Sequence, residues 1–519
     1  MANKKKFYVT TAIDYPNAEP HIGHAYQKII ADVIARWHKL KGEDVFFLTG
    51  TDEHGKKIQE ASEKQGKTPK EFVDELSKRF KESWKLLNID YNRFIRTTDK
   101  DHEKIVQDII KKCEENGDIY LGEYEGLYCT GCEAYYTEKD LIDGCCPIHK
   151  RKVEKLKEES YFFRLSNYQK FLLDLFKKHP EFILPKERRN EIISRVKEGL
   201  SDLSISRTSF DWGIPFPGNK KHVVYVWFDA LFNYYSATQQ KGKEKYWPAD
   251  IHLLGKDNSW FHCVYWPAFL KSAGLKLPKT VFVHGFLQFN GQKISKSLGN
   301  AISPKILVGK YGADSIRYFV CRQFPFGDDG DFSEAALIQR HNDELANKLG
   351  NLVSRVSALA EKYGFEEFNY PITIEKKWEK YIREGKIEVK KILSLNPDKT
   401  IHVFNRKNEQ GEESLLFDSY FQLRPTLRLI CNLVEYQVEH SQFDKALNTI
   451  FAFIDNCNNF IQNKKIWESE DKRALYELKE SILEIARLLS PFIPESAEKI
   501  KKQFSAKKMK KGDILFEKI

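Results

Sequence analysis

Five short runs of β-branched, aromatic and other apolar residues mark the strands of a buried sheet. They lie at residues 7–11, 45–48, 223–226, 251–254 and 281–283. The second run is apolar throughout, which is typical of a parallel strand covered on both faces by helices. The pattern therefore predicts one α/β domain with a parallel sheet.

The segment between the first two strands has the spacing of an amphipathic helix. Its apolar residues repeat with the helical period from Ile22 to Leu40, and Gly42 follows at a position that favours a helix end. We expect a helix over residues 22–41. Strand, loop, helix and strand then form a βαβ unit.

The same pattern divides the chain into parts. A stretch rich in Cys, Gly and Tyr interrupts the sheet pattern after about residue 117, and from about Glu334 the chain is mostly helical. We predict a Rossmann-type doubly wound parallel sheet, split by a zinc-containing insertion and followed by an α-helical bundle. The predicted boundaries are 1–116, 117–221, 222–290, 291–345 and 346–519. The polar loop 396–413 has no assigned role.

Composition narrows the class of protein. Hydrophobic residues make up 41% of the 519 residues and charged residues 30%, which excludes a disordered or fibrous chain. The net charge of +10 suits an anionic partner such as a nucleotide or nucleic acid. No apolar window reaches the ~20 residues that span a bilayer, and residues 1–6 lead directly into a strand, without a secretory leader. We expect a cytoplasmic protein without a membrane partner.

The first candidate site is His21-Ile22-Gly23-His24, where the predicted helix begins after the first strand. Ligands of doubly wound sheets bind beyond the carboxyl ends of the strands, where free N–H groups at helix N-termini favour phosphate. Gly23 allows close approach to the backbone, and the two imidazoles add hydrogen-bond donors. Alone, this four-residue pattern has little specificity.

The second candidate site is Lys293-Ile294-Ser295-Lys296-Ser297, between small and polar residues. Two lysines on such a loop can neutralise charge on a phosphoryl group when the loop closes. By itself, this segment would be an exposed basic turn. It indicates a functional site because the same chain also carries the histidine motif, on an α/β scaffold.

The two segments together resemble the HIGH and KMSKS signatures of class I aminoacyl-tRNA synthetases, with Ile for Met in the second. Further segments resemble the methionyl-tRNA synthetase family, of the form with a single zinc knuckle. They are residues 50–55, 226–230 with Tyr234, and 255–257 with Phe261, His262, Trp266 and Pro267. The resemblance implies that 291–345 is the KMSKS-loop and stem-contact region and 346–519 the anticodon-binding domain.

The resemblance also implies a methionine site. Asp52 and Arg207 would hold the ammonium and carboxylate of the substrate. The other implied methionine-binding residues are Ile13, Tyr15, Trp227, Ala230, Tyr234, Asp257, Phe261 and His262. Aromatic and aliphatic walls suit a flexible thioether. Asn258 departs from the aliphatic residue that is more usual at its position, and this affects the rim of the pocket.

Four cysteine and histidine residues have the spacing of a metal site. Cys129-x₂-Cys132 and Cys146-x₂-His149 supply four ligands, with thirteen residues between the pairs. Such a set favours tetrahedral structural zinc, one per chain. Cys145 stands beside Cys146, and the spacing leaves either able to ligate, although Cys146 resembles the knuckle of the family.

In the helical part, Asn351 and Arg355 stand one helical turn apart and, with Trp467, resemble the anticodon contacts of the family. RNA loops are read by stacking unpaired bases on aromatic rings and by hydrogen bonds to base edges. A tryptophan on an amphipathic helix is otherwise usually a core residue. The expected partner is methionine tRNA, bound by a monomer.

The implied reaction forms methionyl-adenylate from L-methionine and ATP, with Mg²⁺, and then transfers methionine to tRNA, releasing AMP and pyrophosphate. His21, His24, Lys293 and Lys296 would be catalytic. ATP would contact His21, Gly23, His24, Gly255 and Lys296. The alternatives are a class I synthetase for another amino acid, or a synthetase-like protein that binds tRNA without charging it.

Overall fold

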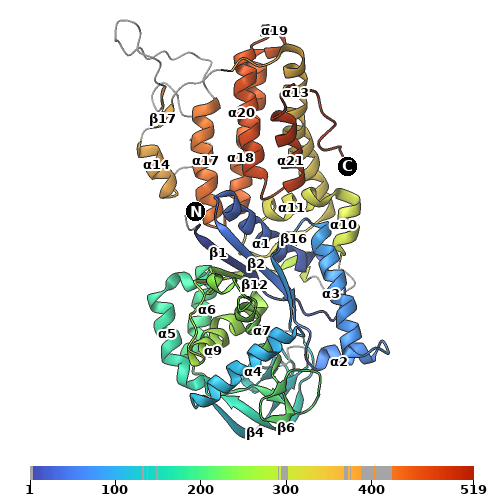
Figure 1. The fold of residues 1–519 in the computed structure, drawn as a ribbon, viewed down its shortest axis with the longest axis vertical. Helices are drawn as coiled ribbons and strands as arrows, with labels where there is room; N and C mark the ends of the chain where they lie inside the picture. The colour runs from blue at the N-terminus through green and yellow to red at the C-terminus, as the bar shows by residue number, and fades with distance from the viewer. Residues whose placement is uncertain are drawn as a thin grey trace. The chain divides into compact units, whose positions relative to one another are not determined.

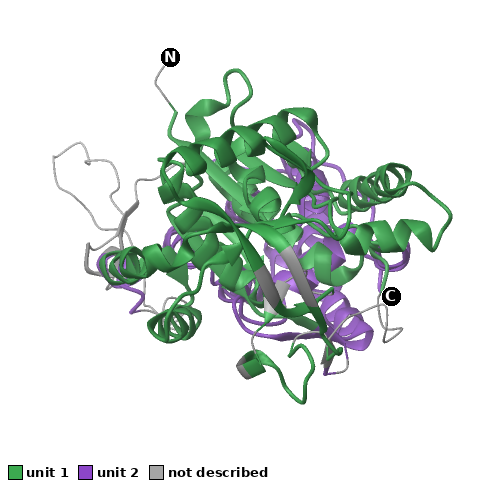
Figure 2. Cartoon of the chain, turned by 90° about the horizontal axis from the view of Figure 1, so that it is seen from below, with its two compact units in different colours: residues 1–287, 293–305 green, residues 288–292, 306–519 purple. Residues whose placement is uncertain are grey.

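The computed structural model describes most of the chain. The described residues are 4–130, 134–136, 138–147, 150–289, 291–293, 302–367, 372–374, 376–386, 401–403 and 423–519. They form two compact units (Figure 2). The first unit holds residues 1–287 and 293–305, and the second holds 288–292 and 306–519.

A six-stranded sheet forms the centre of the first unit (Figure 1), and every neighbouring pair of strands is parallel. In spatial order the strands are β3 (Arg93–Arg96), β2 (Asp44–Thr51), β1 (Lys6–Thr11), β12 (Ile251–Gly255), β13 (Thr280–His284) and β7 (Ile183–Leu184). From β1 the chain winds outward through β2 and β3, and from β12 it winds to the other side. This is the doubly wound arrangement that the sequence predicts.

Two details of the predicted sheet differ from the structure. Residues 223–226 do not join the parallel sheet, so this prediction is wrong. Val223 and Val224 end β11 (Asn219–Val224), which pairs antiparallel with β9 (Ser206–Arg207) and β10 (Pro215–Phe216). Val226 already begins helix α7 (Val226–Leu231). The run is apolar because its residues are buried, and residues are buried in the β9–β10–β11 sheet as well as in the parallel sheet. The two parallel strands that the pattern does not predict are β3 and β7.

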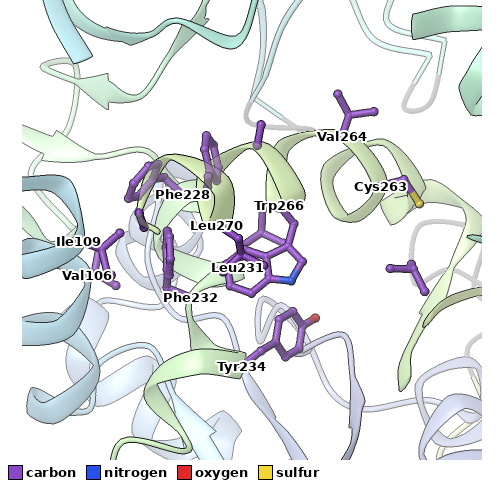
Figure 3. Packing of buried hydrophobic residues seen from close by; sticks show 14 of the residues in the cluster. Val106, Ile109, Phe228, Leu231, Phe232, Tyr234, Cys263, Val264, Trp266 and Leu270 are labelled. Carbon is purple, nitrogen blue, oxygen red and sulfur yellow. The ribbon is translucent and has the colours of Figure 1, made fainter. Parts of the chain in front are cut away.

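Helix α1 (Ile22–Leu40) confirms the helix predicted from the apolar period, and Gly42 follows it with φ +83°, as a helix-ending glycine does. The other helices of the first unit are α2 (Lys56–Glu63), α3 (Pro69–Leu86), α4 (Lys100–Glu115), α5 (Gln169–Lys178), α6 (Lys186–Lys197), α7, α8 (Asn233–Ser236) and α9 (Trp266–Ser272). Figure 3 shows Val106 and Ile109 of α4 beside the aromatic side chains of Phe228, Phe232 and Trp266, all buried. These aromatic side chains form the core around α7 and α9.

A second sheet lies in the chain between β3 and β12. Its order is β5 (Ala134–Tyr136), β4 (Ile119–Cys129), β6 (Glu154–Phe163) and β8 (Leu203–Ser204), and every pairing is antiparallel. Strands β4 and β6 pair from Ile119↔Phe163 to Tyr128↔Glu154. Cys129 stands at the far end of this hairpin. The chain therefore leaves the parallel sheet after β3 and returns to it at β7, inside the range 117–221 that is predicted to be an insertion.

The second unit is mainly helical, as predicted from Glu334 onward. It includes helices α11 (Ala313–Arg322), α12 (Glu334–Arg340), α13 (Asn351–Tyr363), α14 (Lys376–Arg383), α17 (Leu423–Glu439), α18 (Phe443–Lys464), α19 (Ile466–Ser469), α20 (Lys472–Leu489) and α21 (Pro494–Phe504), and the π-helix η8 (His341–Gly350). Helix α10 (Pro304–Tyr311) connects the units in sequence. Short strands are β14 (Leu287–Phe289), β15 (Gln292–Lys293), β16 (Gly330–Phe332), β17 (Ile372–Ile374) and β18 (Ile401–Val403).

Apart from strand β18, the loop 396–413 lies outside the described residues. Within the part of the chain that the structure describes, no helix is long and apolar enough to cross a membrane.

A buried ion pair joins α1 to the end of β1. Lys28 is fully buried, and its Nζ lies 2.5 Å from Asp14 Oδ1. The same ammonium donates to the carbonyl oxygen of Ala12 at 3.1 Å and to Gln27 Oε1 at 3.0 Å. Burial raises the pKa of Asp14 to about 6, against the attraction of Lys28, and burial lowers the pKa of Lys28. Each charge therefore depends on the other.

Replacing Lys28 by Met should destabilise the first unit by ~3–5 kcal/mol, because it leaves the Asp14 carboxylate buried without its cation. Denaturant unfolding measures the loss. The double variant Lys28→Met, Asp14→Asn should recover most of it. Lys39→Met on the same helix is the control, since its partner Asp90 is exposed and such a pair contributes ~0–1 kcal/mol. Equal stability of Lys28→Met and wild type would contradict the assignment.

Candidate active site

The carboxyl ends of β1 and β2 are joined beyond the last paired residues of the sheet. The N–H of Asp14 donates to the carbonyl of Gly50 at 2.9 Å, and the N–H of Asp52 donates to the carbonyl of Asp14 at 2.8 Å. Gly50 has no room for a side chain, because a Cβ there would lie 1.9 Å from the carbonyl oxygen of Ile95. Asp52 is thus held beside the end of β1, next to the point where the winding of the sheet reverses.

His21 and His24 close the N-terminus of α1. His21 is the N-cap residue, and its Nδ1 accepts the N–H of Gly23 at 3.1 Å. His24 Nδ1 accepts the N–H of His21 at 3.2 Å, and the two rings stack 3.8 Å apart. Because each Nδ1 is an acceptor, a neutral ring carries its proton on Nε2. A Cβ at Gly23 would lie 3.0 Å from the His21 ring, so glycine suits this turn.

Burial, with the nearby charge of Lys28, lowers the pKa of His24 to about 3. The ring is therefore neutral near pH 7 and donates through Nε2–H. Free N–H groups and the dipole of α1 make the same place attractive to an anion. The arrangement can bind phosphate oxygens without carrying a buried imidazolium.

Strand β12 supplies the other side of the reversal point. It ends at Gly255, where a Cβ would lie only 2.9 Å from Asp257 Oδ1, and Asp257 itself is exposed. At the end of β13, His284 Nε2 lies 3.2 Å from Gln27 Nε2 of α1. Of the two predicted lysines, Lys293 ends β15, and Lys296 lies outside the described residues.

An aromatic cluster follows β12 and α7. The rings of Trp227 and Phe261 stack with centroids 3.7 Å apart and an interplanar angle of 6°, and both residues are half-buried. The ring of His262 meets Trp227 edge-on at 6.1 Å. Phe261 and His262 stand on the π-helix η6 (Phe261–Tyr265), and Ala230 on α7 is buried. A single π-turn is common at functional sites, because it redirects side chains within a helix.

Hydrogen bonds fix the polar groups of this aromatic cluster. His262 donates from Nδ1 to the carbonyl of Asn258 at 2.9 Å, so its Nε2 accepts the hydroxyl of Tyr234 at 2.7 Å. Burial lowers the pKa of His262 to about 4. Burial also raises the pKa of Tyr234, and the negative charge of Asp52 adds to the effect. Both rings are therefore uncharged near pH 7, and Asp52 is close enough for its charge to affect the pKa of Tyr234.

The structure places the remaining predicted residues as follows. Ile13 and Tyr15 are half-buried against the same core as Trp227 and Phe261, and the Tyr15 hydroxyl donates to the carbonyl of His54 at 3.0 Å. Arg207 is buried, donates to Ser204 Oγ at 2.8 Å, and stands 4.5 Å from the ring centroid of Tyr225. Its pairing with the substrate carboxylate stays a prediction.

A buried hydrogen-bond network joins this cluster to two other segments, and sequence reasoning missed it. Asp229, between Trp227 and Ala230 on α7, is fully buried and accepts from His54 Nδ1 and His102 Nε2, each at 2.7 Å. Burial opposes its charge, but the two histidines hold the pKa of Asp229 below its ordinary value. Burial likewise opposes the charge of His54, but Asp229 raises the pKa of this ring. Asp229 thus connects α7, α4 and the loop that carries Asp52.

Comparisons with known proteins agree with this geometry. A sequence model described as tRNA synthetases class I (M) matches residues 7–155 and 137–357. The methionine–tRNA ligase of Caldanaerobacter subterraneus subsp. tengcongensis is 44% identical, over 99% of this chain and 79% of the relative. That of Brucella suis biovar 1 is 43% identical, over 96% of this chain and 91% of the relative. The chain belongs to the methionyl-tRNA synthetase family.

Solved structures of the family have the same fold. Mycobacterium tuberculosis methionyl-tRNA synthetase in complex with methionyl-adenylate is 37% identical, with a TM-score of 0.82 over 96% of this chain and 94% of that one. The apo form of the same enzyme aligns with a TM-score of 0.76 at 33% identity. The family predicted from the sequence motifs is therefore confirmed, and the chain is a class I aminoacyl-tRNA synthetase.

In this synthetase, two of the four predicted metal ligands are described. Cys129 and Cys146 are buried, at 2% and 1% exposure, whereas Cys145 is half-buried and exchanges both backbone hydrogen bonds with Ile142. Cys132 and His149 lie outside the described residues. No group of three or more possible metal ligands occurs among the residues that the structure describes. Two buried thiols at these positions fit a thiolate metal site, and burial favours Cys146 over Cys145.

The RNA-binding residues predicted for this synthetase lie on two neighbouring helices. Asn351 is exposed and Arg355 half-exposed, one turn apart on α13. Trp467 on the short helix α19 is 40% exposed, and its carbonyl accepts the hydroxyl of Tyr363 at the end of α13. Trp467 is therefore not a core residue. It falls within residues 427–518, which match a model described as anticodon-binding domain of tRNA ligase.

We predict that His262 makes the first unit less stable in acid. Its ordinary pKa is 6.5, and its folded value is about 4. Between these values the unfolded chain binds the extra proton, so the free energy of unfolding falls as the pH falls. Denaturant unfolding at several pH values should give a slope that is smaller by up to ~1.4 kcal/mol per pH unit in His262→Gln. Asn258→Ala keeps the backbone carbonyl and should retain the wild-type slope. An unchanged slope in His262→Gln would refute the prediction.

Proposed function

We infer that this chain attaches L-methionine to its tRNA in two steps. A carboxylate oxygen of methionine bonds to the α-phosphorus of ATP, and the bond from that phosphorus to the bridging oxygen of pyrophosphate breaks. The 3′-terminal adenosine hydroxyl of tRNA then takes the methionyl group, and AMP leaves with the bonding electrons. The observation that carries this conclusion is the relative solved with methionyl-adenylate, which aligns over 96% of this chain.

The ends of β1 and β12, with the N-terminus of α1, support a site for ATP. His21 and His24 would donate from Nε2 to phosphate oxygens, and Gly23 and Gly255 would allow the nucleotide near the backbone. Lys296, with Lys293, would neutralise the departing pyrophosphate. Phosphoryl transfer needs mainly positioning and charge stabilisation, which these donors supply. Mg²⁺ would enter with ATP and neutralise its phosphate oxygens.

The aromatic cluster supports a site for the methionine side chain. Trp227, Phe261 and Ala230 offer apolar surface, and sulfur–aromatic contacts contribute ~0.3–1.5 kcal/mol each. His262 donates its ring N–H to the carbonyl of Asn258, and Tyr234 donates its hydroxyl to His262, so both side chains are uncharged toward the ligand. Asp52 would hold the ammonium group and Arg207 the carboxylate. Such a pocket favours an uncharged, flexible side chain.

The proposal also includes a structural zinc ion and tRNA recognition by the helical unit. Cys129, Cys132, Cys146 and His149 would hold the ion, and as four protein ligands they would leave no open position for catalysis. Asn351, Arg355 and Trp467 would contact the anticodon. The cytoplasmic location and the monomeric state stay predictions from the sequence.

The test of the function is ATP–pyrophosphate exchange with each of the twenty amino acids. Methionine alone should stimulate exchange, because adenylate formation is reversible and the pocket selects the side chain. Stimulation by another amino acid would keep the class and contradict the assigned specificity. No exchange with folded protein would favour a tRNA-binding protein without catalysis.

The variant Lys296→Ala tests the role of this lysine in the same assay. It should slow exchange by orders of magnitude while methionine affinity, measured by calorimetry, stays near wild type. Unchanged exchange would remove the lysine from the mechanism.

Metal analysis of the purified protein tests the zinc site. We expect about one zinc ion per chain, the usual content of one four-ligand structural site. Cys146→Ser should lose most of it, whereas the neighbouring Cys145→Ser should retain it, because Cys146 has the ligand spacing and the greater burial. Equal zinc content in both variants would contradict the choice of Cys146.

A further inference from the structure

Four unpaired lysines cluster just after α21. Residues 507–511 read Lys-Lys-Met-Lys-Lys, and no acidic residue stands between Ser505 and Gly512. All four lysines are exposed, whereas Met509 between them is 7% exposed. None of the four ammonium groups has an ion pair with any described residue. The methionine therefore anchors a short segment that presents four positive charges to solvent.

The backbone of this lysine segment is held to its own unit. Gln503 Nε2 on α21 donates to the carbonyl of Lys510 at 3.1 Å, and the N–H of Lys511 donates to Glu361 Oε2 on α13 at 3.2 Å. A Cβ at Gly512 would lie 2.8 Å from Gln503 Nε2, so the chain passes close to that side chain. These contacts, with the buried Met509, fix the segment in one place.

That place is the C-terminal end of α13, where Tyr363 also contacts the predicted anticodon residue Trp467. Glu361 follows Arg355 by six residues, which is about 9 Å along a helix. Lys362 falls on the same helical face as Asn351 and Arg355, at spacings of eleven and seven residues. Helices α13, α20 and α21 pack side by side (Figure 1). The lysine segment thus lies at the end of α13 that contacts Trp467, and Arg355 and Asn351 follow along the same helix toward its other end.

Several other cations of the second unit are paired with carboxylates of the same unit. Arg473 pairs with Glu366 at 2.8 Å, Lys465 with Glu468 at 3.5 Å and Lys348 with Asp455 at 2.6 Å. Lysines 507, 508, 510 and 511 repel one another, and no ion pair with a described residue offsets this repulsion. Such a cluster is suited to a polyanion, whose condensed counterions it can displace.

We propose that these four lysines bind the phosphate backbone of the anticodon stem of tRNA. The contact is independent of base sequence and fixes the position of the stem, while Asn351, Arg355 and Trp467 read the loop. This inference rests on the proposed function, because it needs tRNA as the partner. It adds a binding surface that the adenylation step does not use.

The test is the salt dependence of RNA binding by the full chain. Fluorescence anisotropy would follow binding of methionine tRNA and of an isolated anticodon stem–loop hairpin between about 50 and 200 mM salt. The variant with Lys507, Lys508, Lys510 and Lys511 changed to Gln should bind both RNAs roughly tenfold or more weakly at low salt. Its slope of log K against log salt should be shallower by about 3, since each neutralised phosphate contributes ~0.7–0.9.

Two matched variants separate charge from structure. Changing the same four lysines to Arg should retain the wild-type slope. Changing four paired lysines of the same unit (Lys310, Lys348, Lys380 and Lys386) to Gln removes the same net charge and should leave the slope nearly unchanged. An unaltered slope in the first variant would overturn the proposal. So would a loss seen with whole tRNA and not with the hairpin, or binding of the segment to anionic lipid vesicles with no effect on RNA.

Methionine-dependent pyrophosphate exchange distinguishes failure of this inference from failure of the proposed function. Exchange needs no tRNA, so the Gln variant should exchange at the wild-type rate. If the wild-type chain failed to exchange, the proposed function would fail whatever the RNA slopes were. Normal exchange with an unchanged RNA slope would reject the lysine surface alone.

Discussion

The reversal of winding between β1 and β12 is the constraint on which the first unit depends. All six strands are parallel, so their carboxyl ends meet at one edge. The chain leaves β1 toward one side of the sheet and β12 toward the other, and ligands of doubly wound sheets bind at such a reversal. Asp14 and Asp52 follow β1 and β2 there, and Gly255 ends β12. Residues more than two hundred positions apart meet through this topology.

The sequence predicts the elements whose signal is local. Helix α1 has a long apolar period, and four of the five predicted strands join the parallel sheet. The prediction for the run 223–226 is wrong, because an apolar pattern indicates a strand and does not indicate which strand lies beside it. Strand β7 has only two residues, too few for any pattern. Partner choice is set by packing over the whole chain, which a window of ten residues does not contain.

The candidate site divides in the same way. The histidine motif and the aromatic residues are found from sequence because their order resembles a family. Their hydrogen-bond states are not predicted, since the Nε2–H form of His24 follows from a backbone donor and the Nδ1–H form of His262 from the carbonyl of Asn258. The partners of Asp229 lie 175 and 127 positions away, so no local motif indicates them. Geometry supplies the protonation chemistry that residue types leave open.

The Asp229 network also limits how the pocket could change its substrate during evolution. Both carboxylate oxygens are committed to histidines on separate segments, so α7 has little freedom to slide and widen the space beside Trp227. Moving the helix would expose the Asp229 carboxylate to solvent or leave it buried without its histidine partners. A new side-chain preference is therefore more accessible through substitutions at residues proposed to line the pocket, such as Ala230 or Ile13, than through displacement of the helix. The amino-acid specificity can vary in its lining while the frame behind that lining is held fixed.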